Sequence, residues 1–215
     1  MTRITRITPA SGASKAPTTG ETYDMTESKS IPSLHRVSVT GPRVHLREVG
    51  EGDFDAAWAW ASREEFFRFL PIEQPDRSDE RIWLESVIAE AREVSRRQYQ
   101  LGIEALNNGS LVGMVRLGID SERDRSANIG YGINPDFWGL GYATEAARLI
   151  VRFGFETLGL HRIWATHHPE NFASRRVLDK IGFQEEGRRR DDRFVGGAWY
   201  VRRRCLVRLC RVLDS

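Results

Sequence analysis

The 215-residue sequence has little cysteine, no long apolar run and almost no net charge. Its two cysteines, Cys205 and Cys210, are five residues apart in a segment that is typical of a β-strand. An odd offset in a strand places two side chains on opposite faces of a sheet. We therefore expect neither a mutual disulfide nor a shared metal ion, and we predict reduced thiols in a cytoplasmic protein.

These absences exclude several classes of protein. No apolar run approaches the roughly 18 residues that a membrane-spanning helix needs. The 32 basic and 30 acidic side chains nearly balance, which argues against a nucleic acid as the partner. No metal-ligand spacing occurs, because His167 and His168 are adjacent and neighbouring strand side chains point apart. We therefore expect no metal ion. The 40% of hydrophobic residues is typical of a globular protein, so we expect a folded core.

The first 36 residues differ from the rest of the chain. They are rich in Thr, Ser, Ala, Gly and Pro and show no hydrophobic period. They also lack the apolar segment of about 7–15 residues that a secretory signal contains. We predict a disordered tail over residues 1–36 and one folded domain over residues 37–215. Met25 is an alternative start, which leaves open whether residues 1–24 belong to the native protein.

The hydrophobic pattern of the domain predicts an α/β fold. Runs of alternating residues predict strands over 43–49, 99–106, 111–119, 126–135, 161–168, about 183–189 and 198–209. Helical periods predict helices over 54–70, 78–94, 144–159 and 171–182, with Asp53 and Ser78 as the caps of the first two. Hairpin-like connections between several strands predict a mixed, largely antiparallel sheet.

A glycine-rich elbow, "FWGLGYATEA" over residues 137–146, joins a strand to a helix. Bare backbone N–H groups at a helix N-terminus bind phosphate groups, and Gly139 and Gly141 allow close approach. The third glycine of a dinucleotide-binding motif is absent, because Thr144 stands at its position, and no P-loop lysine follows. A phosphate site and a purely structural turn both remain open from this segment alone.

Two further segments, "PENFAS" (169–174) and "VLDKIGF" (177–183), follow the elbow in order. With these three motifs, residues 38–212 resemble the acyl-CoA-dependent N-acyltransferases of the GNAT superfamily, in particular the RimJ/RimL-type branch. That branch acetylates protein N-termini and various small amines. The resemblance implies the GNAT fold: a twisted, largely antiparallel sheet flanked by helices, with central strands that splay apart.

The resemblance also implies acetyl-CoA as the co-substrate and a set of residues that contact it. Its pyrophosphate would lie on the elbow amides of Gly139, Leu140, Gly141, Tyr142, Ala143 and Thr144. Backbone groups near Tyr131 and Ile133 would pair with the pantetheine arm, and one N–H there would hold the thioester oxygen. Asn171 would bind the pantetheine arm as well as cap its helix, whereas capping alone is the structural alternative. Ser174 would present its hydroxyl to the thioester sulfur.

Two departures from the family pattern bear on these roles. Trp138 stands where the elbow motif of the superfamily begins with Arg or Gln, so we expect backbone contacts to phosphate with one side-chain contact fewer. Arg202 stands near a position where the resemblance implies an acidic residue, so we expect altered acceptor recognition. By the same resemblance, the stretch Phe66–Pro71 forms an apolar wall of the acceptor cleft.

The expected reaction is direct acetyl transfer to a primary amine, in a ternary complex without a covalent enzyme intermediate. The acceptor is a protein N-terminus, an amino acid, or an amine-bearing metabolite or antibiotic. Glu104 and His167 are weak candidates for the general base, and a solvent-facing role is favoured for both. A non-catalytic acyl-CoA-binding or sensing module is the alternative function. The identity of the amine, a longer acyl donor and a homodimer are left open.

Overall fold

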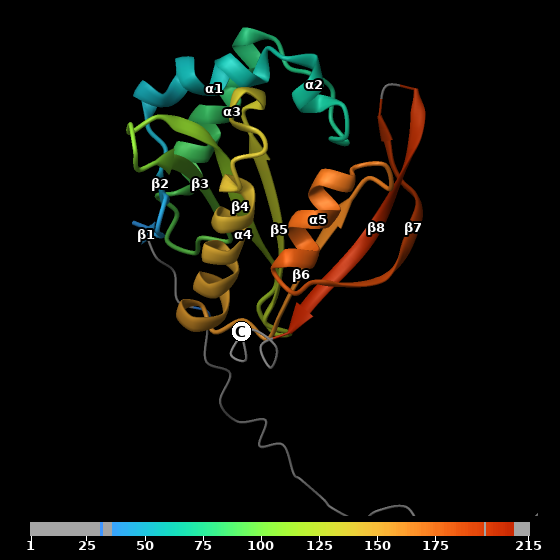
Figure 1. Cartoon of the computed structure of the whole chain (residues 1–215). Helices are drawn as coiled ribbons and strands as arrows, with labels where there is room; N and C mark the ends of the chain where they lie inside the picture. Colours follow the sequence, from blue (N-terminus) through green and yellow to red (C-terminus); the bar gives the residue numbers. More distant parts are fainter. Residues whose placement is uncertain (1–30, 32–35, 196, 209–215) are drawn as a thin grey trace, which may run out of the picture.

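An eight-stranded sheet forms the centre of the structure, a computed structural model that describes residues 31, 36–195 and 197–208 (Figure 1). The strands are β1 (Ser38–Thr40), β2 (Val44–Glu48), β3 (Gln98–Ala105), β4 (Leu111–Ser121), β5 (Ser126–Ile133), β6 (Arg162–His167), β7 (Gln184–Val195) and β8 (Ala198–Arg208). They lie in the order β1-β2-β3-β4-β5-β6-β8-β7. Only the β5–β6 pair among them is parallel, so the predicted mixed, largely antiparallel sheet is confirmed. The predicted disordered tail and Cys210 lie almost entirely outside the described residues.

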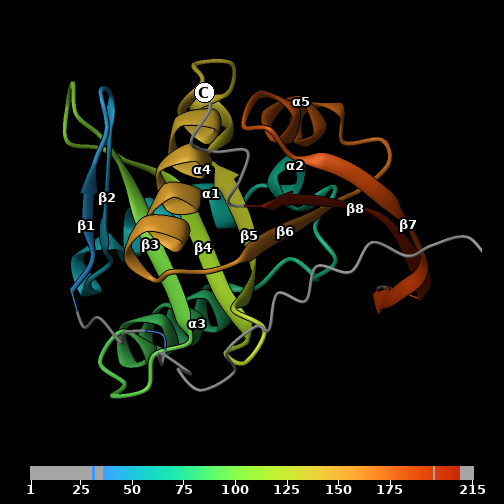
Figure 2. The same cartoon turned by 90° about the horizontal axis from the view of Figure 1, so that it is seen from below.

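Helices cover both faces of the sheet (Figures 1 and 2). They are α1 (Phe54–Ala61), α2 (Glu64–Phe67), α3 (Arg77–Glu90), α4 (Tyr142–Arg152), which continues as a π-helical turn (Phe153–Thr157), and α5 (Phe172–Lys180). The alternation of β4 shows how the layers form. Val115 and Leu117 are buried in the core beneath α4, while Met114 packs on the opposite side against α1 and α3. Side chains that alternate along a strand thus separate two apolar layers.

Three details of the first two helices differ from the prediction. The continuous helix expected over residues 54–70 is interrupted after Ala61 and resumes as the short α2. Asp53 makes no capping bond, because its carboxylate accepts hydrogen bonds from Arg47 at 2.8 Å and from the backbone of Gly50. The cap of α3 is Asp76, not Ser78, since the Asp76 carboxylate accepts the N–H of Ser78 at 2.7 Å. At Asp53, a contact from Arg47 on β2 overrides the local signal.

The two central strands β5 and β6 separate part-way along their length. Their parallel ladder ends where Ile129 pairs with Ala165. Beyond that point β5 stays paired with β4 as far as Ile133, and β6 stays paired with β8 as far as His167. A gap therefore opens in the sheet from Gly130 onward, as expected for splayed central strands.

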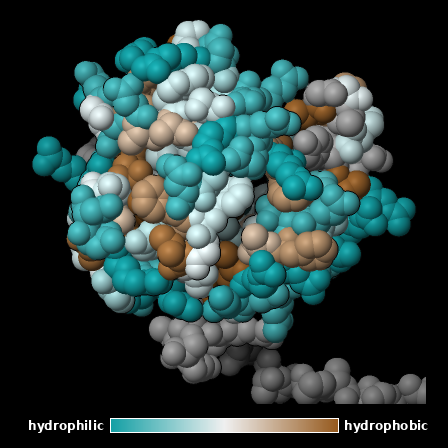
Figure 3. Space-filling view, turned by 45° about the horizontal axis from the view of Figure 1, so that its top comes forward, coloured by the Kyte–Doolittle hydropathy of each residue, from teal (hydrophilic) through white to brown (hydrophobic). Residues whose placement is uncertain are grey.

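The surface is mostly polar on the face shown in Figure 3. Apolar atoms appear there as separate patches and form no continuous surface. The largest cluster of buried apolar side chains joins the sheet to α4. The gap between β5 and β6 is the feature of this fold that leads to a cavity.

Candidate active site

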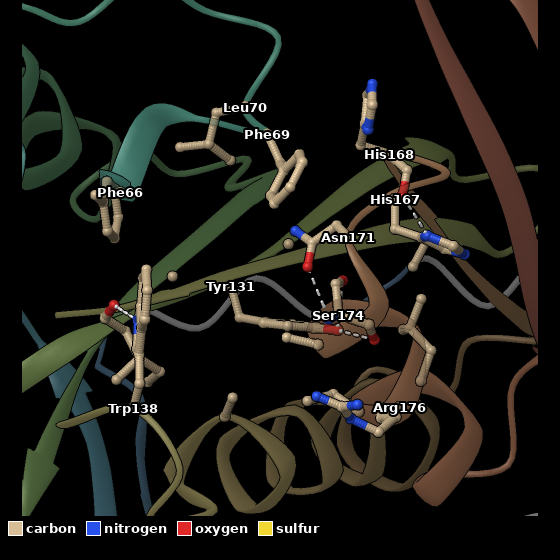
Figure 4. A pocket seen from close by; sticks show the side chains of 18 of the residues that line it. Phe66, Phe69, Leu70, Tyr131, Trp138, His167, His168, Asn171, Ser174 and Arg176 are labelled. Carbon is tan, nitrogen blue, oxygen red and sulfur yellow. Dashed lines mark hydrogen bonds between the residues drawn. The ribbon is translucent and has the colours of Figure 1, made fainter. Parts of the chain in front are cut away.

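A cavity of about 930 Å³ lies where β5 and β6 part. Its walls are β5, the elbow before α4, the end of β6, α5 and the segment that follows α2. In Figure 4 the aromatic side chains of Phe66 and Phe69 lie on one side, Arg176 lies on the opposite side, and Asn171 and Ser174 lie between them. The cavity thus connects a half with an aromatic wall to a half bordered by the elbow.

The elbow has the geometry of an anion-binding turn. Gly139 and Gly141 both have φ of +80°, which side chains with a Cβ rarely adopt. Helix α4 begins at Tyr142, so the amides of its first turn have no carbonyl one turn earlier and can bind a ligand. Gly139, Gly141, Tyr142, Ala143 and Thr144 all line the cavity. Leu140 does not line it, and its role in binding rests on its amide alone.

A clamp behind the elbow was missed by the sequence analysis. Arg43, just before β2, donates to the carbonyl of Leu140 at 2.8 Å and to the carboxylate of Glu145 at 2.8 Å. Glu145 in turn accepts the backbone N–H of Arg43 at 2.7 Å and that of Val44 at 3.1 Å. Burial acts to raise the pKa of Glu145, but these hydrogen bonds outweigh it and hold the pKa below its usual range. The two partners are about a hundred residues apart, so no local pattern could reveal the clamp.

The backbone of β5 faces the gap at the predicted positions. The N–H of Asn134 donates to Val112 on β4 at 2.9 Å. Because these groups alternate sides along an antiparallel strand, the backbone groups of Tyr131 and Ile133 face the gap. The indole N–H of Trp138 donates to the carbonyl of Ile133 at 2.7 Å, so one of the two lone pairs of that oxygen is already used (Figure 4). Trp138 therefore secures the end of β5 to the elbow.

Asn171 and Ser174 meet a third polar group at the centre of the cavity. The side-chain oxygen of Asn171 accepts the N–H of Ser174 at 2.9 Å, so Asn171 is the cap of α5. Its second role, binding the pantetheine arm, stays a prediction. The hydroxyl of Tyr131 lies 3.0 Å from Ser174 Oγ and 3.1 Å from the Ser174 carbonyl oxygen (Figure 4). The sequence predicts only backbone contacts for Tyr131, so the position of this phenol is known from the structure alone.

The apolar half of the cavity comes mainly from the segment after α1. Phe66, Phe69, Leu70 and Pro71 line the cavity, as the predicted apolar wall requires. Phe67 does not line it and packs instead against the cluster around α1. The Phe66 ring occupies the space that Gly132 of β5 leaves, because a Cβ on Gly132 would lie 2.6 Å from it. Phe69 stacks on His168 at a ring distance of 5.3 Å, which joins this wall to the end of β6.

The two candidate bases have different surroundings. Glu104 does not line the cavity and pairs with Arg47 at 2.6 Å on β2, so the structure argues against it as a base. His167 does line the cavity and is buried. Its Nδ1 lies 2.8 Å from the carbonyl oxygen of His168, which can only accept, so Nδ1 carries the proton. In the neutral ring Nε2 is therefore the acceptor, and it has no hydrogen-bond partner among the described residues.

Basic side chains border both halves of the cavity. Arg176 and Lys180, spaced by one helical turn on α5, line it on the elbow side and were missed by the sequence analysis. On the acceptor side, Arg202 lines the cavity and donates to Thr166 at 3.0 Å. It also forms an ion pair with Asp192, which the irregular pairing of β7 turns inward. An acidic group thus lies beside Arg202, supplied by the neighbouring strand.

Metal-binding clusters and membrane-spanning helices are both absent from the described residues. No group of three or more His, Cys, Asp or Glu side chains there is arranged to hold a metal ion. Within the same part of the chain, no helix is both long enough and apolar enough to cross a membrane.

The comparison with known protein families identifies this arrangement. The family described as "Acetyltransferase (GNAT) domain" matches residues 43–184, which include the elbow, the splayed strands and α5. The chain belongs to the GNAT acetyltransferase family. It is 34% identical to the uncharacterized N-acetyltransferase YoaA of Bacillus subtilis over 158 residues, which are 74% of this chain and 89% of YoaA. This GNAT chain is therefore an acetyltransferase by family.

Two further relatives indicate the branch of the GNAT family. The putative ribosomal N-acetyltransferase YdaF of Bacillus subtilis is 43% identical over 106 residues, 47% of this chain and 58% of YdaF. The structure of Mycobacterium smegmatis RimJ in complex with CoA-disulfide is 29% identical, with a TM-score of 0.70 over 83% of this chain and 92% of RimJ. The chain is thus a RimJ/RimL-like member of the GNAT family.

Proposed function

We propose that the protein moves an acetyl group from acetyl-CoA to a primary amine by direct transfer in a ternary complex. The observation that carries the proposal is the cavity at the β5–β6 gap, because it joins an anion-binding elbow to an apolar acceptor wall. A donor and an acceptor that enter from the two sides would meet beside Ser174. Holding two reactants in this way replaces a collision in solution by a reaction within one complex.

The residues of the elbow side fit acetyl-CoA. The amides of the predicted set around Gly141 would hold the pyrophosphate at the N-terminus of α4. Arg176 and Lys180 add positive charge on the same side, which suits phosphate groups. The gap-facing backbone groups of Tyr131 and the N–H of Ile133 would pair with the pantetheine arm. Asn171 would bind the arm in addition to capping α5.

The chemical step needs a neutral amine, a stabilised oxyanion and a stabilised leaving thiolate. The amine nitrogen attacks the thioester carbon, a C–N bond forms, and the C–S bond breaks with its electron pair on sulfur. A backbone N–H of Tyr131 or Ile133 would hold the negative oxygen of the intermediate. The hydroxyl of Ser174 would donate to the departing sulfur. Because an α-amino group has a pKa of about 8, water or Nε2 of His167 suffices to remove its proton, which ends on the thiol.

A covalent enzyme intermediate is not part of the proposal. Burial raises the pKa of the Cys205 thiol to about 11, so this side chain stays protonated and is a poor nucleophile at neutral pH. A free, buried thiol is also the form expected in a reducing compartment, and we place the reaction in the cytoplasm.

The charges of the acceptor side narrow the choice of amine. Arg68 and Arg116 line this side together with Arg202, whose charge Asp192 balances, and Glu65 is the acidic group among the lining residues. A polyamine would bring further positive charge against these arginines, and like charges repel. We therefore expect acceptors whose remaining groups are neutral or acidic: a peptide N-terminus, an amino acid, or an uncharged or acidic amine metabolite.

Thiol release from acetyl-CoA in the presence of an amine panel tests the proposal. The panel contains peptides, amino acids, amine metabolites and spermidine, and mass spectrometry identifies each acetylated product. We expect release with at least one neutral or acidic acceptor and little with spermidine. The Gly141→Val variant is the control for background release. If CoA raises the thermal midpoint but no amine releases thiol, the protein is an acyl-CoA sensor and the proposed function is wrong.

A further inference from the structure

The phenol of Tyr131 is placed to act on Ser174. Tyr131 lies on β5 and Ser174 on α5, and the tyrosine side chain bridges the gap between these elements (Figure 4). Its oxygen lies 3.0 Å from Ser174 Oγ and 3.1 Å from the Ser174 carbonyl oxygen. Burial raises the pKa of Tyr131 above its usual range, so the phenol keeps its proton at physiological pH. It can therefore donate a hydrogen bond but is a poor source of a transferable proton.

A phenol has one proton, and here it has two acceptors on the same residue. If Tyr131 donates to the Ser174 carbonyl, the Ser174 hydroxyl can donate back to the phenol oxygen, and its proton then points away from the cavity. If Tyr131 donates instead to Ser174 Oγ, the serine proton is released toward the cavity. The two distances differ by only 0.1 Å, so the phenol can donate to Ser174 Oγ or to the Ser174 carbonyl oxygen without a shift of its ring.

We propose that Tyr131 is a positioning residue that turns the Ser174 hydroxyl proton toward the leaving sulfur. This inference rests on the proposed function, because it assumes that Ser174 donates to the thiolate. As negative charge develops on sulfur, the phenol donates to Ser174 Oγ and the serine donates to sulfur. Only the two O–H bonds rotate, and no proton leaves either residue. Hydrogen bonds in such a chain strengthen one another, so Ser174 becomes a better donor.

Without the phenol, the Ser174 hydroxyl would be free to bond a backbone carbonyl of its own helix. Ser174 lies in the first turn of α5, where a serine hydroxyl can bond the carbonyl three residues earlier, which here belongs to the cap Asn171. That orientation directs the proton along the helix and away from the cavity. Tyr131→Phe keeps the ring and removes only the group that competes with this local bond.

A double-mutant cycle tests the inference. We expect Tyr131→Phe to lower kcat about tenfold while the KM for acetyl-CoA and the Kd for CoA change less than twofold. In the Ser174→Ala background the same substitution should have no further effect on kcat, because the group through which Tyr131 acts is gone. Tyr99→Phe is the matched control: Tyr99 is fully buried and does not line the cavity, so its variant should keep the wild-type kcat.

A second variant covers the case in which Tyr131→Phe does not fold. Incorporation of 3-fluorotyrosine at position 131 keeps the ring and hydroxyl and makes the phenol a stronger donor. When Ser174 is present, we expect the kcat of the fluorotyrosine protein to equal or exceed that of the wild type. In the Ser174→Ala background, we expect fluorotyrosine and tyrosine at position 131 to give the same kcat.

Each outcome decides the inference. Equal kcat for wild type and Tyr131→Phe, additive losses in the cycle, or a lower kcat with 3-fluorotyrosine would each show that Tyr131 does not act through Ser174. In those cases the wild type still turns over, so the proposed function stands. If the wild type itself releases no thiol with any amine, the proposed function fails and this inference fails with it.

Discussion

The substitution Gly141→Val separates the phosphate site from a structural turn. Gly141 has φ of +80°, and a Cβ there would lie 3.1 Å from the guanidinium of Arg43. The left-handed backbone costs a residue with a Cβ about 1–2 kcal/mol. At roughly 2–4 °C per kcal/mol for a chain of this size, we expect the thermal midpoint to fall by about 2–8 °C. The protein should therefore remain folded at the temperature of a binding assay.

The free energy of CoA binding should fall by more than the free energy of unfolding does. Hydrogen bonds to a charged group contribute about 1.5–3 kcal/mol each, so the loss of two elbow amides weakens binding by about 3 kcal/mol or more. This corresponds to at least about a hundredfold rise in Kd, measured by calorimetric titration with CoA. Gly109→Val is the matched control, because Gly109 has φ of +68°, lies in the β3–β4 turn and has open space around its Cβ. It should lose similar stability and bind CoA normally. A folded Gly141→Val protein with wild-type affinity would refute the assignment of the elbow.

Three further substitutions test individual contacts. Ser174→Ala should lower kcat by about one to two orders of magnitude with little change in the acetyl-CoA KM, and a wild-type rate in steady-state assays would exclude its role at the sulfur. Asn171→Ala should cost about 1 kcal/mol of stability through the lost cap and also raise the acetyl-CoA KM. Asn171→Asp keeps a capping oxygen and should restore stability, and an unchanged KM in the alanine variant would reduce Asn171 to a cap. Arg43→Ala should raise the acetyl-CoA KM several-fold at constant kcat, because the Leu140 carbonyl loses its side-chain donor and Glu145 keeps only its two backbone donors. Unchanged CoA titrations for that variant would contradict the clamp.

Local signals in the sequence were sufficient for most of the elements. The period of α4 follows from residues close together in the chain, although the helix begins at Tyr142, directly after Gly141, and not at the predicted residue 144. The failures occurred where a distant partner competes with a local one. Asp53 precedes a helix and is a typical cap, but Arg47 takes its carboxylate. Phe67 shares the period of the apolar wall, but its ring packs toward α1.

The sequence alone determined the family and the parts of the site that lie in contiguous motifs. The elbow, the cap at Asn171 and the neighbouring Ser174 are short-range patterns, since each depends on spacing within one turn of chain. Only the tertiary structure could bring Arg43 to the elbow and the Tyr131 phenol to Ser174, because these pairs lie 97 and 43 residues apart. It also showed that the two candidate bases have different surroundings, since Glu104 pairs with Arg47 across β2 and β3 while His167 lines the cavity. Contacts of this kind follow from the register of the sheet and the packing of helices on it, which no single stretch of sequence encodes.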